Sequence, residues 1–498
     1  MTNARFVIAL DQGTTSSRAV LINRAGAIVG MIQNEFPQIY PEPGWVEHDP
    51  VDILTSQLGA LTELLISHAL TQDDISALGI TNQRETALVW NRETGEPVYN
   101  AIVWQDRRTA PLMDSLAEQP EIAEMIAAKT GLVCDPYFSA SKITWILDNV
   151  PGAREDAEAG KLAFGTVDTW LIWTLTQGQV HATDPTNASR TMLYNIHEGC
   201  WDDELLALFN IPRSLMPQVQ PSASCFGRTS NPGAIQDIPI CGVAGDQQAA
   251  LFGQGCFYPG DAKCTYGTGC FLLMSTGDEA KVSHNGLITT IAAAPPDTVD
   301  TQYALEGSVF VGGALVQWLR DELRLIESAE ETEAIAVGVE DTGGVYVVPA
   351  FTGLGAPYWD AEARGAILGL TRGTTKAQVV RACLEAVAYQ VLDLMRAMES
   401  DAELCLERLN VDGGASANNF LMQFQADITD RVLSRPQISE TTALGAAYLA
   451  GLASGFWKNT DELLALHACD DIFTPAHDHA WRQERIAGWN NAIARIRT

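Results

Sequence analysis

The pattern of apolar and polar positions in the first eighty residues predicts strands separated by turns, and one helix. β-Branched apolar residues cluster at 6–10, 17–22 and 27–33, and Gly, Asn and Asp in DQGTTS and NRAG mark the turns between them. Apolar residues recur at helical spacing over 52–70, and a further strand-like run covers 76–83. The order β-β-β-α-β predicts one sheet, to which a helix returns the chain.

A similar order recurs in the second half of the chain. Its elements are a second hairpin, two amphipathic helices and a strand that meets a glycine turn, at 262–276, 314–326, 377–398 and 406–416. No low-complexity linker occurs near 250–260. We therefore predict an α/β protein of two similar domains, 1–254 and 255–498, which pack together and enclose a cleft.

The composition is that of a large globular protein. The 498 residues are 46% hydrophobic, which suffices for buried cores, and no apolar run reaches the roughly 18 residues of a membrane span. The N-terminus MTNARFVIAL leads into a strand without the basic, apolar and small-residue regions of a signal peptide. We therefore expect a cytoplasmic protein with no stable membrane insertion.

The charge balance narrows the expected partners. Acidic residues number 62 and basic ones 31, of which 24 are Arg and 7 are Lys, so the net charge is −31 and nucleic acid is not an expected partner. The acidic, lysine-poor composition fits adaptation to high salt, and it equally fits a mildly acidic cytosolic enzyme with arginine-rich codon usage. Ten cysteines between Cys134 and Cys469 lack C-x-x-C pairs, so we interpret them as buried thiols.

The chain lacks the common phosphate-binding sequence motifs, so any phosphate must be bound in another way. Neither G-x-x-x-x-G-K-[ST] nor G-x-G-x-x-G after a strand occurs, which excludes a P-loop and a Rossmann dinucleotide site. Glycine turns offer the alternative, because their backbone N–H groups approach phosphate oxygens closely and threonine hydroxyls add donors. We predict that the turns at 13–15 and 267–269 hold one polyphosphate from two sides. The turn at Gly413 and Gly414 suits the close approach of an adenine and its ribose.

Two carboxylates lie beside these turns, and each allows two interpretations. Asp11 precedes the first turn, where it fits a Mg²⁺ ligand acting through water and also an ordinary turn cap. Asp246 follows a strand and begins a helix in GVAGDQQAALFG. It fits a carboxylate that works on a phosphate, and it also fits an N-cap that satisfies free helix N–H groups. The residues alone leave both choices open.

Several motifs resemble those of a known family. DQGTTSSR, GDQQAALFGQ and DGGASANNF are similar to the phosphate and adenosine motifs of the actin–Hsp70–sugar kinase superfamily. YFSASKITWILDN and GAILGLTRGTTKAQVVRACLEAVAYQ resemble the two signatures of the FGGY carbohydrate kinases. The resemblance covers about residues 5 to 460, and it implies two duplicated ribonuclease-H-like (actin-like ATPase) domains with an interdomain cleft.

Further motifs resemble the members of this family that phosphorylate glycerol: NQRET, WVEHDP, GTVDTWLIW, TNASRTMLYNI and PAFTGLGAPYW. The resemblance implies transfer of phosphate from ATP, with Mg²⁺, to glycerol, giving ADP and sn-glycerol 3-phosphate as the first step of glycerol catabolism. Asp246 is implied as the catalytic base. A homo-oligomer, dimeric or tetrameric, is expected.

The resemblance also implies the binding residues. Those for the nucleotide are Thr14, Thr15, Ser16, Arg18, Thr268, Gly313, Gln317, Gly414 and Asn418. Those for glycerol are Arg84, Glu85, Trp104, Tyr137, Asp246, Gln247 and Phe271. The set suits a triol, since Arg donates, Glu accepts, Tyr does either and rings cover the C–H faces. The predicted residue for Mg²⁺ is Asp11, acting through water.

One departure and two rival functions stay open. Some bacterial members of the family bind a sugar bisphosphate inhibitor through a loop with Gly and Arg, but RTSNPGAIQDIPI has no basic residue between Thr229 and Ile240, so we expect weak or absent inhibition of this kind. A related kinase of the same fold could act on another polyol, a pentulose or a hexulose. A nucleotide-switched chaperone or filament of the actin and Hsp70 type would need no small acceptor at all.

Overall fold

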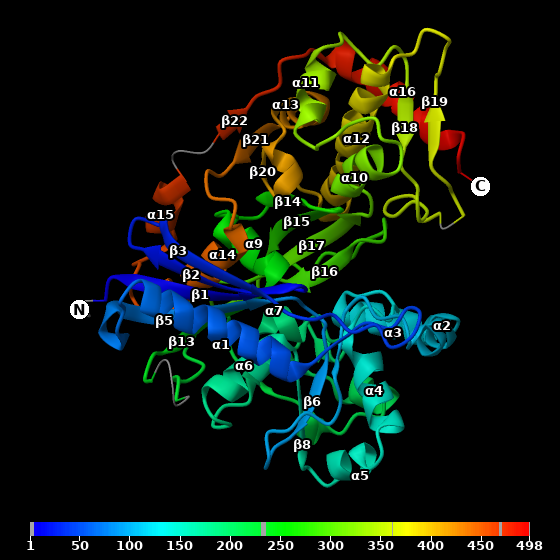
Figure 1. The fold of residues 1–498 in the computed structure, drawn as a ribbon. Helices are drawn as coiled ribbons and strands as arrows, with labels where there is room; N and C mark the ends of the chain where they lie inside the picture. The colour runs from blue at the N-terminus through cyan, green and yellow to red at the C-terminus, as the bar shows by residue number, and fades with distance from the viewer. Residues whose placement is uncertain (1–3, 231–235, 361, 468–470, 498) are drawn as a thin grey trace.

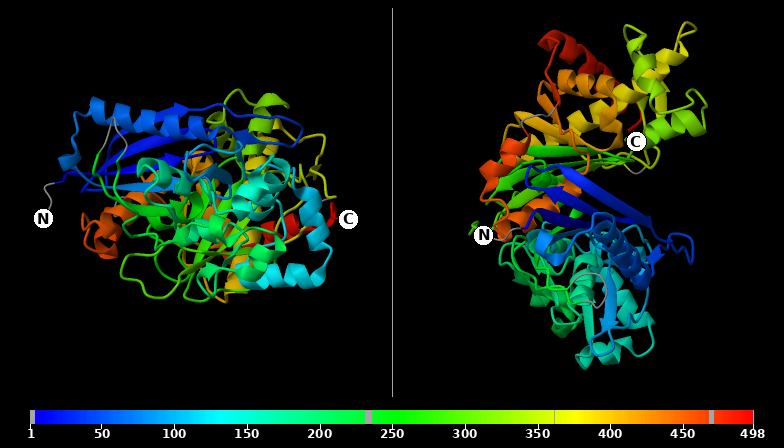
Figure 2. Two further views of the ribbon diagram at one scale, coloured as in Figure 1. Left: turned by 90° about the horizontal axis from the view of Figure 1, so that it is seen from below. Right: turned by 60° about the vertical axis from the view of Figure 1, so that its left-hand side comes forward.

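The computed structural model describes residues 4–230, 236–360, 362–467 and 471–497. Two α/β halves are stacked on one another, and each is built around a central sheet (Figure 1). The first half of the chain, blue through cyan to green, lies mainly below, and the second half, green through yellow to red, lies mainly above, as the right-hand view of Figure 2 also shows.

The sheet of the first half has five strands in the order β13-β5-β1-β2-β3. They are β1 (Phe6–Gln12), β2 (Ser16–Asn23), β3 (Ile28–Glu35), β5 (Ile75–Asn82) and β13 (Ile240–Gly245). β1, β2 and β3 form an antiparallel meander, while β5 runs parallel to β1 and β13 parallel to β5. The strands predicted from apolar runs are thus confirmed, with ends within two residues of those expected.

The sheet of the second half repeats this connectivity within seven strands, in the order β16-β17-β15-β14-β20-β21-β22. They are β14 (Ala262–Tyr266), β15 (Cys270–Gly277), β16 (Ile288–Ile291), β17 (Tyr303–Val309), β20 (Arg408–Asp412), β21 (Val432–Arg435) and β22 (Asp471–Phe473). β14, β15 and β17 form the meander, while β20 runs parallel to β14 and β21 parallel to β20. The predicted duplicated α/β fold is confirmed.

The predicted helices are present with partly different ends. α1 (Pro50–Ser67) is capped by Asp49, whose carboxylate accepts the Val51 N–H, and it packs on β2 and β3. α12 (Lys376–Ala402) starts at a capping box formed by Thr375 and Gln378. α10 (Gly313–Asp321) ends five residues before the predicted end at 326, because the chain turns there through a left-handed residue, Arg324, with φ 53°.

The remaining helices are α2 (Ala110–Ala117), α3 (Pro120–Thr130), α4 (Ser139–Asn149), α5 (Ala153–Glu158), α6 (Val167–Leu175), α7 (Pro185–Ala188), α8 (Asp203–Leu208), α9 (Asp246–Gly253), α11 (Glu331–Val337), α13 (Asn419–Thr429), α14 (Thr441–Ala453), α15 (Thr460–Leu464) and α16 (His479–Ala494). Short strand pairs complete the structure: β4 (Glu47–His48) with β7 (Ala101–Ile102), β6 (Leu88–Asn91) with β8 (Leu162–Gly165), β9 (Ala182–Thr183) with β12 (Gln218–Val219), β10 (Tyr194–Asn195) with β11 (Cys200–Trp201), and β18 (Tyr346–Val348) with β19 (Ala366–Leu368).

A helix from the second half of the chain completes the core of the first. α14 packs on β1, β5 and β13 and against α9, and its apolar residues join those of β1 and β2 in one buried cluster. The approach is close, because a Cβ on Gly445 would lie 1.8 Å from the Ala249 carbonyl oxygen and one on Gly79 would lie 2.2 Å from that of Ala446. The ranges 1–254 and 255–498 remain a prediction, and α14 reaches across them.

The interpretation of the cysteines is partly wrong. The nine cysteines in the described part of the chain are free thiols, and five of them are buried. Cys225 and Cys405, however, are exposed, because they lie in loops rather than in strands or helices. Among the described residues, no helix combines the length and the apolar composition needed to cross a membrane.

Candidate active site

The first hairpin turn, between β1 and β2, presents small polar residues next to a charged pair. The Gly13 N–H donates to the Ser16 carbonyl at 2.9 Å and closes the turn. Thr15 is exposed and Thr14 half-buried, and the Thr14 hydroxyl accepts the Trp104 indole N–H at 3.1 Å. This hydrogen bond joins Thr14, a residue predicted to bind the nucleotide, to Trp104, a ring predicted to cover the acceptor.

A buried carboxylate lies behind this turn. Asp11 faces Arg18 across the hairpin, with 3.3 Å between carboxylate and guanidinium, and Arg18 also contacts Glu440 from the second half at 3.2 Å. Burial, with a smaller contribution from Asp246, raises the pKa of Asp11 to about 6, although the Arg18 guanidinium lowers it. Asp11 and Asp246 therefore disfavour each other's negative charge. A cation bound next to them, and to the phosphates of a nucleotide, would relieve this repulsion. The residues present therefore fit Mg²⁺.

The second hairpin turn, between β14 and β15, is hydrogen-bonded to the N-terminus of α10. The N–H groups of Gly312 and Gly313 donate to the carbonyls of Thr268 and Gly267, both at 2.8 Å. A Cβ on Gly313 would lie 2.7 Å from the Gly267 oxygen, so this glycine permits α10 to approach the turn. The Thr268 side chain is exposed, as is that of Gln317 one turn into α10.

The third glycine turn follows β20. Gly413 has φ 86°, and a Cβ there would lie 2.6 Å from the Tyr266 oxygen, whereas a Cβ on Gly414 would meet nothing within 4 Å. Only Gly413 is therefore required by the fold, and Gly414 leaves open space beside the turn. Asn418 caps α13, since its side chain accepts the Leu421 N–H at 3.0 Å.

Asp246 lies where the parallel strand β13 ends and α9 begins. The interpretation of Asp246 as an N-cap is wrong, because Gly245 is the N-cap residue and Asp246 is the first residue of the helix. Its carboxylate accepts the N–H of the adjacent Gln247 at 2.7 Å and lies 3.2 Å from Arg84 Nε. The side chain is 35% exposed, so this carboxylate is only partly buried.

The loop after β5 supplies Arg84 and Glu85, and both side chains are almost fully buried. Glu85 has φ 61°, a left-handed conformation that is uncommon for a non-glycine residue and often marks a functional site. Burial raises the pKa of the Tyr137 hydroxyl, and the nearby Glu85 raises it further. The Tyr137 ring packs edge-on against Trp104, 5.6 Å between centroids. The structure thus brings Arg84, Glu85, Tyr137 and Trp104 to one place.

Three charged residues of this site were missed from the sequence. Glu306 on β17 accepts two hydrogen bonds from Arg84, at 2.6 and 2.8 Å, and Arg190 donates to Glu85 at 2.6 Å. Lys263 on β14 donates to the predicted acceptor residue Gln247 at 2.5 Å. A charge inside an otherwise apolar strand, as in YALEGSV and AKCTY, is the signal that could have identified two of them.

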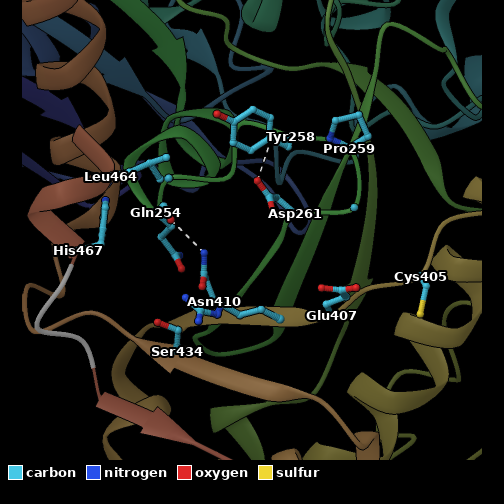
Figure 3. A pocket seen from close by; sticks show the side chains of 13 residues that line it. Gln254, Tyr258, Pro259, Asp261, Cys405, Glu407, Asn410, Ser434, Leu464 and His467 are labelled. Atoms are coloured by element: carbon cyan, nitrogen blue, oxygen red, sulfur yellow. Dashed lines mark hydrogen bonds between the residues drawn. The ribbon is translucent and has the colours of Figure 1, made fainter. Parts of the chain in front are cut away.

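A cavity of about 730 Å³ lies elsewhere, at the opposite ends of β14 and β20 (Figure 3). Its lining includes Asp261, immediately before β14, and Arg408, the first residue of β20. The glycine turns follow the last residues of these strands, so this cavity does not contain the predicted site residues. Residues 231–235, in the stretch considered for a sugar bisphosphate, lie outside the described residues.

Solved structures with low sequence identity define the class of fold. The xylulose kinase from Lactobacillus acidophilus, 22% identical, superposes with a TM-score of 0.87 and covers 98% of each chain. The Plasmodium falciparum glycerol kinase with ADP is 38% identical and superposes with a TM-score of 0.94, covering 99% of this chain and 98% of that one. The structure is therefore that of a two-domain sugar kinase with the actin-like ATPase fold.

The family follows from the sequence comparisons. The N-terminal domain model of the FGGY family of carbohydrate kinases matches residues 6–253, and its C-terminal domain model matches residues 262–454. The chain belongs to this family. It is 60% identical over 495 residues to the glycerol kinase of Symbiobacterium thermophilum, covering 99% of both chains, and 58% identical over 494 residues to that of Vibrio cholerae, covering 99% of this chain and 97% of the relative.

Proposed function

We propose that this protein phosphorylates glycerol with ATP and releases ADP and sn-glycerol 3-phosphate. The observation that carries the proposal is the convergence of the buried Arg84 and Glu85 with Tyr137 and Asp246, which Trp104 joins to the first hairpin turn. The relatives named glycerol kinase, at 58 to 60% identity over nearly the whole chain, support it.

The acceptor pocket suits a small triol. Arg84 supplies guanidinium donors, Glu85 a carboxylate acceptor, and Tyr137 a hydroxyl that does either. Gln247 adds an amide next to Asp246, while Trp104 and Phe271 cover the carbon skeleton. A site built to hydrogen-bond each hydroxyl rejects analogues that leave its buried polar groups unpaired.

Asp246 is the proposed general base. Its carboxylate accepts the proton of the attacking primary hydroxyl, and the oxygen then attacks the γ-phosphorus in line with the leaving ADP. The accessible position of this side chain at the start of α9, with Arg84 3.2 Å away, supports the role. Closure of the two halves excludes water, which otherwise competes as the acceptor.

The nucleotide is proposed to lie between the glycine turns. The phosphates are contacted by Thr14, Thr15, Ser16, Arg18 and Thr268. The remainder of the nucleotide site is lined by Gly313, Gln317, Gly414 and Asn418. Mg²⁺, when bound, neutralises part of the phosphate charge, and Asp11 holds it through water. Because the Gly313 N–H donates to the Gly267 carbonyl, Gly313 contributes space to the nucleotide rather than a hydrogen bond.

A coupled assay of ADP release tests the proposal directly. We expect turnover that depends on glycerol and exceeds the turnover with other polyols, pentuloses or hexuloses. A greater rate with a ketose would identify a related kinase of the same fold. Slow ATP hydrolysis that glycerol does not change would instead favour a nucleotide-switched protein.

A further inference from the structure

Residues of the second sheet reach into the acceptor site of the first half. Lys263, Leu273 and Glu306 are neighbours across β14, β15 and β17, because Lys263 pairs with Leu273 and Leu273 pairs with Glu306. Residues directly opposite one another in antiparallel strands project from the same face of the sheet. This face also carries Phe271, two residues before Leu273 on β15.

The contacts cross between the halves at two points. Both Glu306 oxygens accept from Arg84, at 2.6 and 2.8 Å, and one of them lies 3.3 Å from Arg190 Nη2. Arg190 in turn donates from Nε to Glu85 at 2.6 Å. Lys263 makes the separate 2.5 Å contact with Gln247. Both residues of the Arg84-Glu85 pair are therefore oriented by Glu306, one directly and one through Arg190.

The four charges balance in a site from which water is excluded. The side chains of Arg84, Glu85, Arg190 and Glu306 are each at most 3% exposed. Burial alone raises the pKa of Glu306, but Arg190 and Arg84 outweigh it and hold the value at about 2, so this carboxylate stays ionised. Without it, two guanidinium groups share one carboxylate, and Asp246, 3.2 Å from Arg84 Nε, is an alternative partner.

We propose that Glu306 is a positioning residue of the active site, which aligns Arg84 directly and Glu85 through Arg190 from the opposite half of the molecule. The inference rests on the proposed function. It follows that the acceptor groups are aligned only while the face of β17 is against the first half. Acceptor binding and the approach of the two halves are thereby coupled.

The test is Glu306→Gln, which keeps the shape and removes the charge. A buried guanidinium that loses its charged partner misaligns the pocket, so we expect the glycerol KM to rise roughly 10- to 100-fold, while the ATP KM changes by less than about twofold. Glu385→Gln is the matched control. Glu385 is also a buried carboxylate of the second half, 2.8 Å from Arg381 and 6% exposed, and we expect its variant to keep the wild-type glycerol KM.

Two further variants separate positioning from folding. Glu306→Asp keeps the charge on a shorter side chain and should give an intermediate glycerol KM, and it carries the test should Glu306→Gln fail to fold. Combining Glu306→Gln with Arg190→Gln should raise the glycerol KM by less than the product of the single effects, because both act on Glu85. An unchanged glycerol KM in folded Glu306→Gln, or equal effects in both KM values, would overturn the proposal.

The wild-type acceptor panel distinguishes this failure from failure of the proposed function. If another acceptor proves better than glycerol, the identity of the substrate is wrong, and the same KM comparison with that acceptor still decides the role of Glu306. If no acceptor stimulates turnover, both proposals fall together.

Discussion

The two hairpins of this protein have the same strand pairing and different chemistry. Behind the first turn, Asp11 is paired with Arg18 across β1 and β2, whereas the corresponding pair behind the second turn is Thr265 and Phe271 across β14 and β15. One hairpin thus presents opposite charges at the position where the other presents a hydroxyl and a ring.

The loops after the next parallel strands differ in the same way. β5 leads into Arg84 and Glu85, two buried charges, while β20 leads into Gly413 and Gly414, which have no side chains. Duplication of the sheet places these two loops after equivalent strands, β5 and β20. We propose that the residues at that place decide whether the loop contacts the reacting acceptor or leaves room for the adenine of the nucleotide.

The largest expected effect comes from removing the carboxylate of Asp246, which directly follows β13, the last parallel strand of the first half. Asp246→Asn keeps the shape and loses the base, so we expect kcat to fall about 10²- to 10⁴-fold. Binding of ADP, measured by calorimetry, should stay within a few-fold, and the melting temperature should stay close to wild type because Gly245 is the N-cap. Near-normal turnover in the folded variant would refute the catalytic role.

Asp11→Asn removes the negative charge from the first hairpin and so makes it less different from the second. Burial, with a contribution from Asp246, raises the pKa of Asp11 from 3.8 to about 6. Between these values the folded protein binds a proton that the unfolded chain does not, so this group lowers stability as the pH rises. The stability of the variant relative to wild type should therefore increase by about 2 kcal/mol as the pH rises from 4 to 7.

Denaturant unfolding at the two pH values measures this difference. The same variant should lose the stabilisation that Mg²⁺ with ADP gives to the wild type. A stability difference that is equal at pH 4 and pH 7 would contradict the assignment of the raised pKa to Asp11.

Arg84→Ala tests the loop after β5. Loss of a donor to a buried hydroxyl costs about 1–3 kcal/mol, so we expect the glycerol KM to rise roughly 5- to 150-fold with little change for ATP. The melting temperature should also fall, because Glu306 loses its two shortest hydrogen bonds. Gly414→Ala in the loop after β20 is the counterpart and should affect the nucleotide alone. An unaltered glycerol KM in Arg84→Ala would remove this residue from the pocket.

The smallest effects distinguish the two turns themselves. Thr268→Val removes one hydroxyl donor, so ATP binding should weaken roughly 2- to 10-fold with no change in the glycerol KM. Thr14→Val should weaken ATP binding similarly and also raise the glycerol KM, since the Thr14 hydroxyl accepts the indole N–H of Trp104. Steady-state kinetics with each substrate varied in turn would show this split. Identical profiles for the two variants would mean that Trp104 does not depend on Thr14.

Local pattern was sufficient for the first sheet and for the hairpin and one strand of the second, and insufficient for the contacts between the sheets. The hairpins, α1 and α12 could be predicted because their apolar spacing and turn residues lie close together in sequence. The pairing of Arg84 with Glu306 joins residues 222 positions apart, and no local signal specifies that partner. The packing of α14 on the first sheet was missed for the same reason, because a helix that is apolar all round is compatible with many neighbours.

The packing of α14 on the first sheet has a consequence for synthesis of the protein on the ribosome. Chains emerge from the N-terminus, and domains generally fold as they appear. Here the apolar face formed by β1 and β2 receives its covering helix only at 441–453 of 498 residues. The nascent first half therefore exposes this apolar surface until translation is nearly finished. During that interval the surface is a binding site for chaperones.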